Sequence, residues 1–137
     1  ADRGVADMVG FEASYLDPAS LQRVVTQADV VVLPYESREQ VTSGVLIEAV
    51  AAGKPVVATA FPHAVELLGP GAGLVVPHDD QRALAHALRR VLVEPGLAES
   101  MADRSGRVAP ELRWSSVAAR YRELADTLVA ATSALVA

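Results

Sequence analysis

The sequence predicts an α/β fold in which a parallel β-sheet is covered by helices on both faces. The first observation is that short runs of β-branched residues alternate with helical patterns along the chain. The second is that these runs are apolar on both faces, which is typical of parallel strands between two helix layers. The third is size, because 137 residues, 51% of them hydrophobic, suit one folded domain. We therefore expect a single domain over residues 1–137, with right-handed crossovers.

Four segments are expected to form the strands. The clearest is Asp29–Leu33, where three consecutive valines precede Pro34, a residue that ends strands. Similar runs predict strands at Pro55–Thr59 and Gly73–Val76. A weaker apolar run predicts a strand at Met8–Phe11, near the start of the chain.

Helical patterns fill the intervals between these strands. Ser43–Ala52 is followed by Gly53 and then Pro55, a combination that typically stops a helix. A long helix after Asp79 or Asp80 carries apolar residues at the i, i+3, i+4, i+7 spacing of a buried stripe. The other expected helices are Pro18–Gln27, a turn at Ala64–Leu68, and Leu97–Arg107.

The chain is expected to close with a helix capped by Ser115 or Ser116. Its apolar side chains recur at helical spacing, which predicts that they face inward. These side chains are Val117, Tyr121, Leu124 and Leu128. Trp114 and Tyr121 are interpreted as packing anchors rather than as stacking platforms for a ligand.

The composition narrows the classes of function. Twelve Lys and Arg against seventeen Asp and Glu give a net charge of -5, which disfavours a general nucleic-acid or anionic-membrane surface. The chain has no cysteine, which excludes disulfides and thiolate chemistry. No apolar run approaches the roughly 18 residues of a membrane helix. These features favour a cytoplasmic location, with the inner membrane face as an alternative.

A candidate anion site follows the strand at Asp29–Leu33, because ligands of open α/β sheets bind beyond the carboxyl ends of the strands. A polar loop leads from there into the N-terminus of the next helix, where the backbone N–H groups of Ser43–Leu46 should lack intrahelical partners. Gly44 would let an anion approach closely, and the helix dipole favours negative charge by about 0.3–1 kcal/mol. An ordinary serine-capped helix with hydrated amides is an equally weighted alternative.

Glu48 favours the prediction of a ligand site. It lies one turn into this helix among apolar neighbours, so we expect its carboxylate to be partly buried and to need hydrogen-bond partners. Ribose hydroxyls of a ligand whose phosphate lies on the helix amides would supply them. A solvated or ion-paired glutamate is the alternative.

The segment from Gln40 to Thr59, QVTSGVLIEAVAAGKPVVAT, resembles the signature of the family-4 (group 1) retaining glycosyltransferases of GT-B fold. That signature reads roughly EGFGLVLLEAMAAGKPVVAT and contains two glutamates separated by seven residues. Similar segments occur before it (ADVVVLP) and after it (AVELL, GAGLVVP), so the resemblance covers nearly the whole chain from about Val9. It implies the C-terminal, donor-binding half of a GT-B fold, a Rossmann-like domain that here lacks its first strands.

The resemblance also implies roles for individual residues. Glu48 matches the second glutamate of the pair, which binds the ribose of a nucleoside-diphosphate sugar. Gln40 stands where the family has the first glutamate, which contacts the transferred sugar; the neighbouring Glu39 is the alternative. Arg38 is a candidate for neutralising the diphosphate, with a solvated side chain as the favoured alternative. The loop that holds the diphosphate matches Thr42, Ser43, Gly44, Val45 and Leu46.

Two further segments bear on the site. Glu66 matches a recurrent glutamate of the family, but Pro62 and His63 replace the glycine pair that usually precedes it. We expect a surface role for His63. Asp79 and Asp80 are interpreted as a helix cap rather than as a magnesium site.

The implied function is transfer of a sugar from a nucleoside-diphosphate sugar to an acceptor hydroxyl with retention, without a metal or another cofactor. The acceptor-binding half would lie upstream, so this chain alone is expected to be inactive. The strand at Asp29–Leu33 is expected to expose an unpaired edge, which favours association with a second copy or another segment. Direct closure of the first strand, Met8–Phe11, onto this edge is the alternative. The alternatives are a non-catalytic nucleotide-binding or partner-docking module and a fragment of a sugar-nucleotide epimerase.

Overall fold

The computed structural model describes residues 4–136, with side chains described as far as Thr132. Its centre is a three-stranded parallel sheet in the order β1-β2-β3. The strands are β1 (Val31–Leu33), β2 (Val56–Thr59) and β3 (Gly73–Val76). Val56 of β2 pairs with Val31 on one side and with Gly73 on the other. The predicted α/β class is confirmed.

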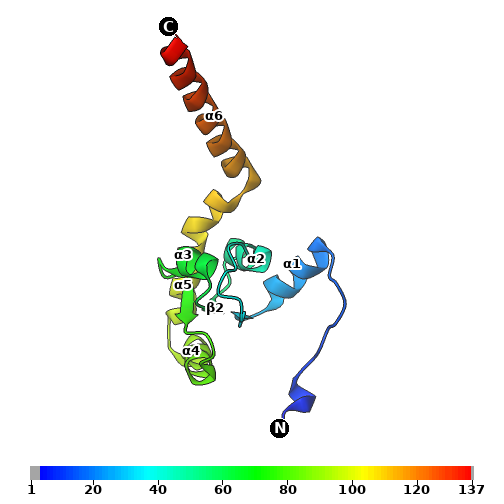
Figure 1. Ribbon diagram of the computed structural model, residues 1–137. Helices are drawn as coiled ribbons and strands as arrows, with labels where there is room; N and C mark the ends of the chain where they lie inside the picture. The colour runs from blue at the N-terminus through cyan, green and yellow to red at the C-terminus, as the bar shows by residue number, and fades with distance from the viewer. Residues whose placement is uncertain (1–3, 137) are drawn as a thin grey trace.

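Helices connect the strands and cover the sheet (Figure 1). They are α1 (Pro18–Gln27), α2 (Gly44–Ala51), α3 (Pro62–Leu68), α4 (Gln81–Val93), α5 (Leu97–Val108) and α6 (Trp114–Val136), with short 3-10 helices η1 (Ala6–Met8) and η2 (Ala109–Leu112). Three of them begin at a side chain that accepts backbone N–H groups of the first turn. These caps are Asp17 for α1, Ser43 for α2 and Asp80 for α4.

The core lies on both faces of β2, because successive side chains of a strand point to opposite faces. Val56 and Ala58 pack on the side of α2 and α3, in a cluster that includes Leu46. Val57 packs on the other side with residues of α4 and α5, including Met101. Every residue of β2 is buried, as expected of the central strand of a covered sheet.

A glycine turn delivers the chain from α2 into β2. Gly53 has a φ of +67°, the left-handed conformation that favours glycine. Its N–H donates to the Val50 carbonyl at 3.0 Å, and the Lys54 N–H donates to the Ala49 carbonyl at 2.9 Å. This is the Schellman pattern of helix ends, and it fixes α2 against the strand that follows.

The prediction of a strand at Met8–Phe11 is wrong. The segment contains the end of η1 and then continues without regular structure, and Met8 and Phe11 are 80% and 91% exposed. A strand exists only within a ladder of hydrogen bonds, and no neighbour in residues 4–136 offers one to this segment. β1 is therefore an edge strand of the described sheet.

The closing helix also differs from the prediction. α6 begins at Trp114, so neither Ser115 nor Ser116 is its cap, and the Ser116 hydroxyl donates to the Pro110 carbonyl instead. The helix projects away from the sheet (Figure 1). Val117 is half-buried, but Tyr121, Leu124 and Leu128, which were also predicted to face inward, are exposed. Trp114, which was predicted to be a packing anchor, is exposed as well. The exposed fractions are 86% for Trp114, 71% for Tyr121, 56% for Leu124 and 58% for Leu128.

Helix α6 is 23 residues long, yet neither it nor any other helix described between residues 4 and 136 is apolar enough over a sufficient length to span a membrane.

Candidate functional site

The N-terminus of α2 lies beyond the carboxyl end of β1, where the sequence predicted an anion site. Ser43 is 3% exposed and caps the helix. Its hydroxyl accepts the Leu46 N–H at 3.2 Å, and its carbonyl accepts the Ile47 N–H at 3.2 Å. A polar loop over residues 34–43 thus ends in a fixed helix start.

The number of amides available to an anion is smaller than predicted. The Leu46 N–H is taken up by the Ser43 hydroxyl, and the Ser43 N–H donates to Nδ1 of His63 at 2.9 Å. Neither amide has a backbone partner within α2, as predicted, but each donates to another acceptor and is not available to an anion. Among the described residues, the N–H groups of Gly44 and Val45 are left without a hydrogen-bond partner. Both belong to the first turn of α2, where the helix dipole favours an anion.

Gly44, Val45 and Glu48 line one pocket of about 520 Å³. The opposite wall comes from the start of α1 and the segment before it. Its lining residues are Ser14, Tyr15, Leu16, Pro18 and Leu21. The pocket is therefore lined on one side by Glu48 and by the two residues whose amides are free, and on the other by a mostly apolar wall.

Glu48 is exposed, so the prediction of a partly buried carboxylate is wrong. The buried positions of α2 are Leu46, Ala49 and Val50, which face the sheet. Glu48 lies four residues after Gly44, which places both on the same face of the helix. That face borders the pocket, so the exposed Glu48 side chain lies at the pocket, one helical turn along α2 from the residues with free amides.

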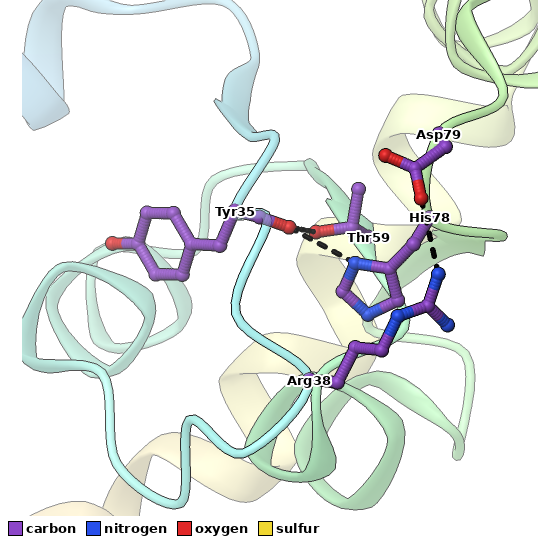
Figure 2. Close-up of polar contacts among 5 residues, drawn as sticks. All are labelled: Tyr35, Arg38, Thr59, His78 and Asp79. Carbon is purple, nitrogen blue, oxygen red and sulfur yellow. Dashed lines mark hydrogen bonds and ion pairs between the residues drawn. The ribbon is translucent and has the colours of Figure 1, made fainter.

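The remaining predicted site residues lie outside this pocket. Gln40 is half-buried, and its side-chain nitrogen donates to the Thr42 carbonyl at 2.7 Å. Glu39 is exposed. Arg38 pairs with Asp79, in the turn after β3, with 3.0 Å between Nη2 and Oδ2, and both side chains are mostly exposed (Figure 2). Of the predicted site residues, the structure thus brings only Gly44, Val45 and Glu48 together at this pocket. Those that do not line it are Arg38, Glu39, Gln40, Thr42, Ser43 and Leu46.

Comparison with protein families matches residues 2–94 to the family model described as Glycosyl transferases group 1. The chain belongs to the group 1 glycosyl transferases. The fold of this glycosyl transferase is similar to that of a sucrose-phosphate synthase from Thermosynechococcus elongatus, with a TM-score of 0.78 and 32% sequence identity. The match covers 93% of this chain and 32% of that one. It agrees with the predicted Rossmann-like C-terminal domain of a GT-B glycosyltransferase. A comparison with curated proteins finds no match.

A second group of polar residues in this group 1 glycosyl transferase was missed by the sequence reasoning. The Tyr35 carbonyl accepts the Thr59 hydroxyl at 2.7 Å and lies 3.1 Å from Nδ1 of His78 (Figure 2). Because a carbonyl can only accept, Nδ1 of His78 carries the proton. These contacts tie together the carboxyl ends of all three strands. Their signal in the sequence is position, since each residue ends or closely follows a strand.

Beside this group lies a smaller pocket of about 190 Å³, whose lining includes Tyr35, Glu36 and Asp79. Asp79 has a φ of +61° in the turn between β3 and α4. Asp80 caps α4, as one of the two predicted alternatives. Within residues 4–136, this glycosyl transferase has no group of three or more His, Asp or Glu side chains placed to hold a metal ion.

Proposed function

We propose that this chain is the donor-binding part of an enzyme that transfers a sugar from a nucleoside-diphosphate sugar to an acceptor hydroxyl with retention. The observation that carries the proposal is the pocket beside α2, where the free N–H groups of Gly44 and Val45 and the Glu48 carboxylate occur together. Membership of the group 1 glycosyl transferases supports it. The chain spans 32% of the similar sucrose-phosphate synthase chain, so the activity of the whole enzyme is part of the proposal.

The diphosphate binds at the start of α2 in this proposal. Hydrogen bonds from Gly44 and Val45 to a phosphate oxygen are charge-assisted, which makes them about twice as strong as neutral ones. Gly44 is exposed and has no side chain, so a phosphate group can approach its backbone. The helix dipole adds to the attraction.

The nucleoside lies along the same face of α2. Four residues at about 1.5 Å each place Glu48 about 6 Å along the helix axis from Gly44, one turn away from the phosphate. From there its carboxylate accepts hydrogen bonds from the ribose hydroxyls. The base contacts the apolar wall formed by residues such as Tyr15 and Leu21.

The transferred sugar lies toward the loop before α2. Gln40 uses its side-chain nitrogen on the Thr42 carbonyl, which leaves its oxygen to accept from a sugar hydroxyl. Glu39 is the alternative contact. Arg38 reaches the diphosphate by exchanging Asp79 for phosphate, a small cost because exposed ion pairs are worth about 0–1 kcal/mol.

The proposed reaction needs stabilisation of the departing diphosphate. The bond between the anomeric carbon and the phosphate oxygen breaks, a bond to the acceptor oxygen forms on the same face, and the acceptor proton passes to the diphosphate. The fixed amides at the start of α2 stabilise the charge that develops on this leaving group. The acceptor-binding half belongs to the same polypeptide in this proposal, and neither a metal nor another cofactor takes part.

The experiment that tests the proposal is calorimetric titration of the protein with UDP, GDP and ADP. We expect one of them to bind, and we expect Glu48→Ala to lose about 1.5–3 kcal/mol of binding free energy, the value of hydrogen bonds to a charged group. Glu99→Ala is the matched control, because Glu99 is an exposed glutamate in the first turn of α5 and lies outside the pocket. Unchanged affinity in Glu48→Ala would remove Glu48 from the site.

A further inference from the structure

The imidazole of His63 holds the turn that precedes the two free amides. His63 is the second residue of α3, yet its Nδ1 accepts the backbone N–H of Ser43 at 2.9 Å, across 20 residues of sequence. Ser43 directly precedes Gly44. The contact therefore joins α3 to the N-terminal cap of α2, at the residue next to the proposed phosphate site.

Every polar group of Ser43 is engaged. Besides the bond to His63, its hydroxyl accepts the Leu46 N–H and lies 3.3 Å from the Tyr35 hydroxyl. The Tyr35 ring in turn stacks on Phe61, with 5.0 Å between ring centroids. Ser43 is thus held from the loop after β1, from α2 and from α3 at once, and it is 3% exposed.

The Ser43 contact fixes the state of the histidine ring. An N–H group can only donate, so Nδ1 of His63 carries no proton and the neutral ring has its proton on Nε2. A side chain without an acceptor at the Nδ1 position would leave the Ser43 N–H buried and unpaired. The backbone would then be expected to rotate until that group finds water, and this rotation would move the neighbouring Gly44 N–H as well.

We infer that His63 is a positioning residue for donor binding, which acts by fixing Ser43 so that the free N–H groups of Gly44 and Val45 keep their place at the start of α2. The inference rests on the proposed function, since the diphosphate is the anion that the positioned amides would bind. His63 does not line the pocket beside α2, so it acts through Ser43 and not by contact with the nucleotide. Holding the amides in place before binding removes an ordering cost that binding would otherwise meet.

The test compares three substitutions by calorimetric titration with UDP, GDP and ADP, well below the melting temperature of each variant. His63→Leu removes the acceptor and is expected to weaken binding between about two- and tenfold, the cost of ordering one mobile group. His63→Asn places an amide oxygen where Nδ1 stood and is expected to restore affinity. His63→Gln places its amide further out and is expected to resemble His63→Leu. His86→Leu, at an exposed histidine of α4, is the control.

The outcomes separate the inference from the proposed function. If none of the three nucleotides binds to the unsubstituted protein, the proposed function fails and the inference fails with it. If a nucleotide binds and His63→Leu binds it equally well, the inference alone is overturned. The same holds if His63→Asn binds no better than His63→Leu, because the role would then be one of packing. Amide hydrogen exchange gives a second readout: exchange at the Ser43 amide, which donates to Nδ1 of His63, should be faster in His63→Leu and return to the original rate in His63→Asn.

Discussion

Gly44→Val separates nucleotide binding from folding at the proposed phosphate site. A Cβ added at Gly44 meets no atom within 4 Å, and the residue is exposed in the first turn of α2. The valine side chain therefore has room in the unliganded protein, and we expect the free energy of unfolding to change by no more than about 0.5 kcal/mol. The same side chain borders the pocket, where it occupies the space through which a phosphate approaches the two free amides.

The loss of affinity can be worked from the bonds that the valine blocks. A hydrogen bond to a charged group is worth about 1.5–3 kcal/mol, so loss of one such bond raises Kd by between about tenfold and 150-fold. Calorimetry gives the affinity, and urea unfolding gives the stability. Gly106→Val is the matched control, because Gly106 is an exposed helical glycine of α5 whose added Cβ also meets nothing within 4 Å. Unchanged Kd together with a lower melting temperature would refute the reasoning, since Gly44 would then be structural only.

Three further predictions concern the fold. Gly73→Ala should destabilise the protein by about 1–3 kcal/mol in urea unfolding, because its Cβ would lie 2.6 Å from the Val56 carbonyl oxygen and 2.9 Å from Leu68. The Ser20 hydroxyl and the backbone of α1 lower the pKa of Asp17. The stability that this adds is present above the ordinary pKa of an aspartate and is lost as the pH falls through the lower folded value. Asp17→Asn keeps the helix cap, so its melting temperature should depend less on pH in that acidic range, and an unchanged dependence would contradict the assignment. Light scattering should detect association through the edge of β1 at high concentration, whereas a strictly monomeric species would show that the edge is protected.

Much of the fold could be predicted because the information is local. The bounds of α1 and β3 agree with the prediction residue for residue, since a proline start, a β-branched run and the hydrophobic period are read directly from the sequence. The predictions of a strand at Met8–Phe11 and of a buried face on α6 were wrong for a common reason. An apolar run predicts that a segment can be buried, but it does not say whether a partner is present to bury it.

The site was predictable in part for similar reasons. Gly44 and Glu48 are four residues apart on one helix, so their shared face follows from helical geometry alone. The exposure of Glu48 follows from the same geometry, because the sheet-facing positions are Leu46, Ala49 and Val50. The sequence could not predict that the Ser43 N–H is unavailable to an anion, because its acceptor, His63, lies 20 residues away.

The most direct test of the proposed donor site is an NMR titration of the protein with UDP, GDP and ADP, in which the amide chemical shifts are measured. We predict that the largest shifts occur at Gly44 and Val45, with smaller shifts at Glu48 and Leu21 across the pocket. Saturable binding with its largest shifts at the ends of the strands, around Tyr35 and Asp79, would contradict the account, because the nucleotide would then occupy the smaller pocket there.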